Sequence, residues 1–383
     1  MTRVLASRLA GFGTTIFTEM SALAERTGSI NLGQGFPDED GPAAVLEAAA
    51  AALRAGHNQY APLAGVPALR QAIAAHQARF YGLDVDPDDG VQVTFGATEA
   101  IAAAMLGLLD EGDVVIVFEP LYDSYAASIA LAGARRRVVT LRPPDFAFDP
   151  DALGAAVTPR TRLVLLNSPH NPTGKVFSRA ELEQVAAVCR EHDLVAVADE
   201  VYEHLVYDGE HVPLATLPGM AERTLTISSL GKTFSVTGWK VGWATGPAEL
   251  VAGVRAAKQY LSFAGATPFQ HAGAAALGLD DGFYAGLADA FRGKRDHLCA
   301  GLEAAGLRPL RPAGTYFVNA RVDGDAAEFC RELPERAGVV AIPTSVFYDD
   351  AEAGRSLVRF AFCKRAAVID EAAARLAGAP AAR

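Results

Sequence analysis

Short apolar runs recur through the middle of the 383-residue chain and restrict the folds open to it. Each run has the composition of a buried strand, and most are separated by sequence with helical character. The predicted strands cover residues 91–95, 114–118, 138–141, 163–167, 195–198, 224–227 and 241–244. Strands that alternate with helices in this way favour an α/β fold built on a mostly parallel sheet.

The regular alternation ends near residue 280, which predicts a second domain. Beyond it the sequence is rich in helix-forming residues, with short apolar runs at 315–320, 339–342 and 357–362. This pattern indicates a smaller α+β unit. We therefore predict an N-terminal arm with part of the small domain over 1–40, a large domain over 41–280 and a C-terminal small domain over 281–383.

Composition excludes several classes of protein. Half of the residues are hydrophobic, which is typical of a globular protein, and the net charge of −11 argues against nonspecific nucleic-acid binding. No apolar run approaches membrane-spanning length, and residues 1–20 lack a signal-peptide pattern. Four widely spaced cysteines and the absence of CxxC and HExxH motifs predict reduced thiols, a cytoplasmic location and no metal site.

The stretch 228–242 carries the clearest chemical signal. It follows a predicted strand and places Lys232 among small and hydroxyl residues. Lysine amines form Schiff bases with carbonyl compounds when they are positioned and partly desolvated. Ser229, Ser235 and Lys240 could bind an anion beside this amine. A covalent lysine next to an anion pocket suggests pyridoxal phosphate (PLP), a carbonyl cofactor that carries a phosphate.

This stretch has two other interpretations. Gly-Lys-Thr also ends a nucleotide-binding P-loop, but that motif requires glycine at position 226, where this chain has threonine. Lys232 could also be an ordinary surface lysine in a turn. The stretch therefore needs support from the rest of the chain.

Polar residues at strand ends provide part of that support. Asn171, Asp199 and Lys232 lie at or just beyond the carboxyl ends of predicted parallel strands, where ligand crevices form. The strand 91–95 enters a helix through Gly96-Ala97-Thr98, which could present backbone N–H groups to an anion. A plain turn capped by Thr98 is the alternative for that segment.

Four motifs now stand in sequence order. They are Asn171-Pro172-x-Gly174, Asp199-x-x-Tyr202, Ser229-x-x-Lys232 and Arg359-Phe360. With them, the chain resembles the class I/II PLP-dependent aminotransferases of fold type I over nearly its whole length, from Leu32 to Phe362. The amino-acid sequence of residues 31–38, 168–174 and 231–240 is similar to that of the kynurenine and glutamine transaminase branch, which includes bacterial methionine aminotransferases. The resemblance makes 41–280 the cofactor-binding domain.

The resemblance implies three catalytic residues. Lys232 would bind the cofactor covalently and transfer a proton, and Asp199 would pair with the ring nitrogen. Tyr202, with Asn171, would hydrogen-bond the phenolic oxygen of the ring. The alternative for Asp199 is a strand-end carboxylate that caps a turn.

The same resemblance implies the other contacts to PLP. Tyr122 would stack on one face of the ring and Val201 would pack on the other. The phosphate would be held by Ala97, Thr98, Ser229 and Lys240. Tyr60 would reach the phosphate bound by a partner subunit, so a homodimer with shared active sites is implied.

For the substrate, the resemblance assigns Arg359 to the α-carboxylate, with Asn171 and Gly35 beside it. An arginine in a surface ion pair is the alternative for Arg359. Phe17, Tyr60, Tyr122 and Phe263 are expected around the substrate side chain, Phe263 from the partner chain. An aromatic and aliphatic lining of this kind favours methionine, phenylalanine, tyrosine, kynurenine or glutamine over aspartate.

The implied activity is that of a PLP-dependent aminotransferase with a ping-pong mechanism. The amino group of an aromatic or sulfur-containing L-amino acid would pass to a 2-oxo acid, with no nucleic-acid or membrane partner. β-Elimination from cysteine S-conjugates, or another PLP reaction on the same fold, stays open. A PLP-sensing transcription regulator would need a winged-helix module, and only about 30 residues precede the first motif.

Overall fold

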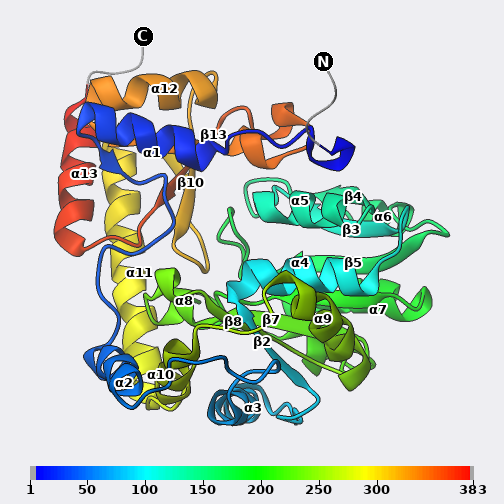
Figure 1. Cartoon of the computed structure of the whole chain (residues 1–383). Helices are drawn as coiled ribbons and strands as arrows, with labels where there is room; N and C mark the ends of the chain where they lie inside the picture. Colours follow the sequence, from blue (N-terminus) through cyan, green and yellow to red (C-terminus); the bar gives the residue numbers. More distant parts are fainter. Residues whose placement is uncertain (1–5, 380–383) are drawn as a thin grey trace.

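A seven-stranded sheet forms the centre of the computed structural model, which describes residues 6–379 (Figure 1). Its strands in spatial order are β2 (Val91–Phe95), β8 (Val241–Thr245), β7 (Thr224–Ser229), β6 (Val195–Asp199), β5 (Thr161–Asn167), β3 (Val114–Glu119) and β4 (Arg135–Thr140). Neighbours from β7 to β4 are parallel, whereas β8 runs antiparallel to both β7 and β2. The predicted α/β fold with a mostly parallel sheet is confirmed.

Helices cover both faces of this sheet, because successive strand residues point to opposite sides. Val115 and Val117 of β3 pack into one apolar cluster, and Ile116 and Phe118 pack into another. The first cluster lies under α4 (Gly96–Leu108), α5 (Asp123–Leu131) and α9 (Ala248–Leu261), and the second lies under α6 (Pro150–Ala155) and α7 (Arg179–Glu191). The sheet is therefore buried on both faces.

A third cluster surrounds the β2–β8 end of the sheet. It takes side chains from α2 (Ala43–Arg54), α3 (Pro67–Tyr81), α10 (Thr267–Leu277) and Leu230 of the short helix α8 (Leu230–Thr233). This packing fixes the position of α8, which carries Lys232.

Two smaller sheets lie beside the large one, at the upper left of Figure 1. One is antiparallel, in the order β12 (Ile342–Pro343), β13 (Leu357–Ala361), β10 (Phe317–Arg321) and β9 (Arg308–Leu310); the other pairs β1 (Ile30–Asn31) with β11 (Val339–Val340). Their core also takes side chains from α1 (Ile16–Thr27), α11 (Asp281–Ala304), α12 (Ala326–Ala337) and α13 (Ala366–Gly378). Because β1 pairs with β11, segments from both halves of the chain share this core. The boundaries at residues 40 and 280 stay predictions, and residues 1–5 and 380–383 lie outside the described chain.

None of the described helices has the length and apolarity needed to cross a membrane. The connections between the elements contain short 3₁₀ helices. The 3₁₀ helices are η1 (Ser7–Leu9), η2 (Leu214–Thr216), η3 (Thr237–Trp239), η4 (Thr344–Phe347) and η5 (Ala351–Gly354).

Two of the predicted strands differ from the observed ones by more than two residues or in their pairing. β4 begins at Arg135, three residues before the predicted start at residue 138. It is the edge strand, and its first three residues are exposed arginines, which do not extend the apolar run used for the prediction. The predicted strand 339–342 is two strands, β11 and β12, which belong to different sheets. A run of apolar residues does not reveal such a change of partner.

Candidate active site

A cavity of about 450 Å³ lies where β5, β6 and β7 end. Every predicted site residue except Tyr60, Phe263 and Ser235 lines it. These lining residues are Phe17, Gly35, Ala97, Thr98, Tyr122, Asn171, Asp199, Val201, Tyr202, Ser229, Lys232, Lys240 and Arg359. The cavity thus brings together groups from the large sheet, from β13 and from the N-terminal segment.

Lys232 is half-buried in α8, directly after β7. Its Nζ donates a hydrogen bond of 3.1 Å to the hydroxyl of Tyr316, which donates one of 2.6 Å to the carbonyl oxygen of Gly35. Loss of solvation lowers the pKa of Lys232 from 10.5 to about 8. The amine is therefore unprotonated, and nucleophilic, at a lower pH than an exposed lysine.

Asp199 is the last residue of β6 and is buried. Its Oδ2 accepts a hydrogen bond of 2.6 Å from Tyr125, and its Oδ1 accepts one of 3.3 Å from the backbone N–H of Val201. Burial raises the pKa of Asp199 to about 6, and the hydrogen bond from Tyr125 opposes that rise. A carboxylate in this setting would be stabilised by a cationic ring nitrogen.

The β2–α4 turn faces the cavity and has the features of an anion site. The helix begins at Gly96, whose φ of +69° suits glycine, and a Cβ there would lie 3.3 Å from the Cε and Nζ atoms of Lys240. Thr98 does not cap this helix; its hydroxyl lies 3.4 Å from Lys240 Nζ. The alternative of a plain turn capped by Thr98 is therefore wrong. The helix start, a hydroxyl and a lysine suit a phosphate.

Arg359 in β13 is 1% exposed, so it is not the surface arginine of the alternative interpretation. It donates to Asn171 Oδ1 at 3.2 Å and to the carbonyl oxygen of Gly33 at 2.7 Å, while its Nε has no partner among the described residues. Burial lowers its pKa from 12.5 to about 10. The rings of Phe17, Phe317 and Phe347 lie 5.2, 4.2 and 5.0 Å from its guanidinium carbon. A buried cation with an unused donor suits a carboxylate ligand.

The donor set as a whole fits PLP. Lys232 would hold its aldehyde carbon, Asp199 its ring nitrogen, and the α4 start with Lys240 its phosphate. The unpartnered Arg359 Nε is left for a second anion, the carboxylate of a substrate.

Tyr60 and Phe263 lie outside the cavity of this chain. Tyr60 is 79% exposed and Phe263 is 44% exposed, and their rings meet edge to face with centroids 5.6 Å apart. Within one chain, neither side chain reaches the residues predicted to bind the cofactor.

Three functional candidates were missed in the sequence. Tyr125 lies one helical turn beyond Tyr122, and Asn167 ends β5, where its side chain donates to the Asp199 carbonyl oxygen and accepts from the Asn171 backbone. Both could have been predicted from their positions: Tyr125 is one helical turn from a predicted site residue, and Asn167 is a polar residue at the end of a strand. Tyr316 gave no such signal, because it meets Lys232 only through the packing of the two halves of the molecule.

Comparison with known proteins gives consistent results. The family model described as aminotransferase class I and II matches residues 27–376. The chain is 54% identical to the probable N-succinyldiaminopimelate aminotransferase of Mycobacterium tuberculosis and 44% identical to the methionine aminotransferase of Escherichia coli, over 97% of each chain in both cases. The solved structure of N-succinyldiaminopimelate aminotransferase from M. tuberculosis superposes with a TM-score of 0.95 at 55% identity, covering 97% of this chain and 99% of that one.

Proposed function

The chain belongs to the class I and II aminotransferases, which are PLP-dependent transaminases, and from that premise we propose that its amino donors are L-amino acids with neutral, largely apolar side chains. Methionine and phenylalanine fit best, with tyrosine, kynurenine and glutamine as further candidates. The amino group would pass to a 2-oxo acid in a ping-pong cycle. This proposal concerns the substrate and the roles of individual residues.

The observation that carries the proposal is the charge of the cavity lining. Its cations within the described chain are Lys232, Lys240 and Arg359, and each already has a place in binding PLP or the α-carboxylate. Around Arg359 the lining is aromatic, and the remaining charged group nearby is the carboxylate of Asp123. A donor with an acidic side chain would meet a like charge there and no free cation.

N-Succinyldiaminopimelate is the second candidate donor, because the relative with 54% identity carries that name. Such a molecule has carboxylates far from the reacting amine. They would need a cation that this chain's cavity does not offer among its described lining residues, so a second subunit would have to supply it. Neutral amino acids and N-succinyldiaminopimelate therefore differ in whether they need an additional cation for binding, and the rates at which they react with the enzyme can be compared.

The proposed mechanism divides the work among the lining residues. Bound PLP supplies an electron sink that makes the proton on the substrate α-carbon acidic. Arg359 and Asn171 hold the α-carboxylate, which turns the α-carbon toward Lys232. Lys232 Nζ would take the proton from that carbon and pass it to the aldehyde-derived carbon of PLP, and Tyr316 holds this amine in place. Asp199 keeps a negative charge where the ring needs one.

We also propose a homodimer with shared active sites, located in the cytoplasm. Tyr60, Tyr260 and Phe263 are exposed aromatic residues, at 79%, 85% and 44%, and solvated faces rarely gather such side chains. A second copy that covers them would bring Tyr60 to the neighbouring phosphate site. The cytoplasmic location rests on four buried cysteines that are unpaired.

The test is a set of half-reactions. Purified enzyme loaded with PLP is mixed with one amino acid at a time, without a 2-oxo acid, and conversion of the cofactor to its amine form is followed by absorbance. Rapid conversion by methionine or phenylalanine and slow conversion by aspartate and N-succinyldiaminopimelate would support the proposal. The opposite order would contradict it. Pyruvate and ammonia released from a cysteine S-conjugate would reveal β-lyase activity.

A further inference from the structure

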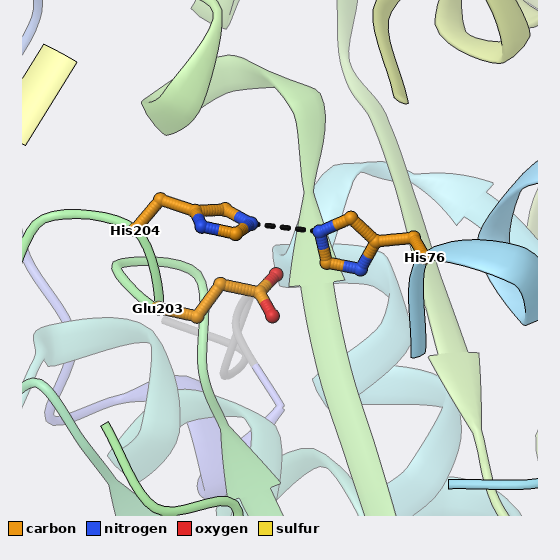
Figure 2. A group of neighbouring side chains, drawn as sticks. All are labelled: His76, Glu203 and His204. Carbon is orange, nitrogen blue, oxygen red and sulfur yellow. Dashed lines mark hydrogen bonds between the residues drawn. The ribbon is translucent and has the colours of Figure 1, made fainter. Parts of the chain in front are cut away.

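A group of ionisable side chains lies behind one wall of the cavity, where the mechanism does not use it. Tyr202 and Ser229 face the cavity, whereas their neighbours Glu203 and Ser228 hydrogen-bond each other away from it. Figure 2 shows Glu203 below the imidazoles of His76 and His204. One ligand atom from each of these three residues lies within 4.8 Å of the others.

Glu203 is a buried carboxylate held by two hydroxyl groups. Its Oε2 accepts a hydrogen bond of 2.7 Å from Tyr81, and its Oε1 accepts one of 2.6 Å from Ser228. These donors favour the ionised form and fix its orientation. In the described chain no lysine or arginine forms an ion pair with Glu203, although buried charges are usually paired or bound to a metal.

The two histidines meet beside this carboxylate. Their Nε2 atoms are 2.7 Å apart, so one of them must carry the hydrogen (Figure 2). Nδ1 of His76 has no partner among the described residues, so hydrogen bonding does not satisfy the pair in either tautomer. Both imidazoles are packed among aromatic rings, including those of Phe80 and Tyr284.

We propose that His76, Glu203 and His204 form a binding site for a divalent transition-metal ion, with zinc as the best match. Two imidazole nitrogens and one carboxylate oxygen are a common donor set for Zn²⁺, with water in the remaining position. The ion would place a positive charge directly against the buried carboxylate of Glu203.

Binding requires a small rearrangement. Two nitrogens at about 2.0–2.1 Å from a tetrahedral zinc lie roughly 3.3 Å apart, so the Nε2 atoms must separate from their present 2.7 Å. The hydrogen between them would move to Nδ1 of the ring that carries it, which leaves both Nε2 lone pairs free. His204 is only partly buried and lies in the loop after β6, so its ring can make most of this movement.

The sequence predicted no metal site, because the metal-binding motifs that can be recognised in a sequence consist of residues close together along the chain. Here His76 comes from α3, and Glu203 and His204 come from a loop more than a hundred residues later. A metal bound to all three would tie α3 to the loop that follows Asp199 and contains Tyr202. We therefore expect it to stabilise the enzyme without entering the cavity.

The experiment uses PLP-loaded enzyme that has been treated with a chelator and dialysed. Zn²⁺ is titrated while the thermal midpoint is measured, and Co²⁺ is titrated while its visible absorption is recorded. We expect one ion per chain, a raised midpoint and the absorption of a four- or five-coordinate Co²⁺. Glu203→Gln and His204→Ala should each weaken binding by about tenfold or more.

The matched control is His271→Ala. It removes one imidazole from a stacked pair formed by exposed His57 and half-buried His271, whose ring centroids are 3.9 Å apart, and should leave binding unchanged. Because His204 is partly exposed, its alanine variant keeps the test valid if Glu203→Gln fails to fold. Equal Zn²⁺ affinity in the wild type and His204→Ala, or loss of binding in His271→Ala alone, would overturn the proposal.

Discussion

The hydroxyl of Tyr316 lies 3.1 Å from Nζ of Lys232, and it links that amine to the backbone of Gly35. Tyr316 follows β9 and belongs to the smaller core, whereas Lys232 follows a strand of the large sheet. The residue proposed to move the proton is therefore positioned by a side chain from the other half of the molecule.

Tyr316→Phe removes this contact and should lower kcat by about twofold to tenfold, as expected for a lost hydrogen bond of about 0.5–1.5 kcal/mol. KM for the amino acid should change little, because the α-carboxylate contacts stay intact. Steady-state kinetics with methionine would measure both. Tyr207→Phe, which removes a buried hydroxyl bonded to the Thr315 carbonyl oxygen, is the control; an equal loss in both variants would argue against a specific role.

Tyr125→Phe should raise the pKa of Asp199 further above its value of about 6, because the lost hydrogen bond favours the carboxylate. More of Asp199 is then protonated near neutral pH, so PLP binding should weaken and recover as the pH rises. Hydrogen bonds to charged groups contribute about 1.5–3 kcal/mol, which corresponds to at least a tenfold change in Kd. The Kd of PLP, measured as a function of pH, would show the shift. An unchanged profile would contradict the assignment.

Lys232 should react in its unprotonated form. With a pKa lowered to about 8, its amine gains reactivity as the pH rises toward and through that value and loses it below. The rate of PLP capture by cofactor-free protein should follow this curve and level off at higher pH. Lys232→Ala should abolish covalent capture and turnover with folding intact, whereas Lys294→Ala, which breaks a surface ion pair with Glu39, should do neither.

Arg359→Lys keeps the charge but loses the planar pair of donors. Loss of a charge-assisted hydrogen bond of about 1.5–3 kcal/mol should reduce kcat/KM for methionine by at least about tenfold, mainly through KM. The absorbance of bound PLP should stay the same, because Arg359 is assigned to the substrate. A large loss of PLP with normal KM would reverse that assignment.

Shared active sites can be tested by subunit mixing. Lys232→Ala and Tyr60→Ala should each reduce the activity of the homodimer. In a mixed dimer, the Tyr60→Ala subunit retains Lys232 and receives Tyr60 from its partner, so one complete site forms. Activity should therefore rise when the two impaired variants are mixed. No recovery, with mixed dimers verified by mass spectrometry, would rule out sharing through Tyr60.

The sequence predicted the large sheet well because its strands are buried on both faces and read as continuous apolar runs. It also predicted the polar residues at the strand ends, such as Asp199, because parallel strands end at one edge. It missed Tyr316 and the grouping of His76 with Glu203, since both depend on how distant elements pack. The prediction for the edge strand β4 was too short, because the strand starts with exposed arginines instead of apolar residues.

The N-terminal segment meets the rest of the site in a way that affects how the enzyme can diversify. Its backbone binds Arg359 and Tyr316 through the carbonyl oxygens of Gly33 and Gly35. Phe17 and Gln34 of the same segment line the cavity. Replacements at these two positions can therefore alter substrate preference during evolution or directed selection while the proton-transferring machinery is inherited unchanged.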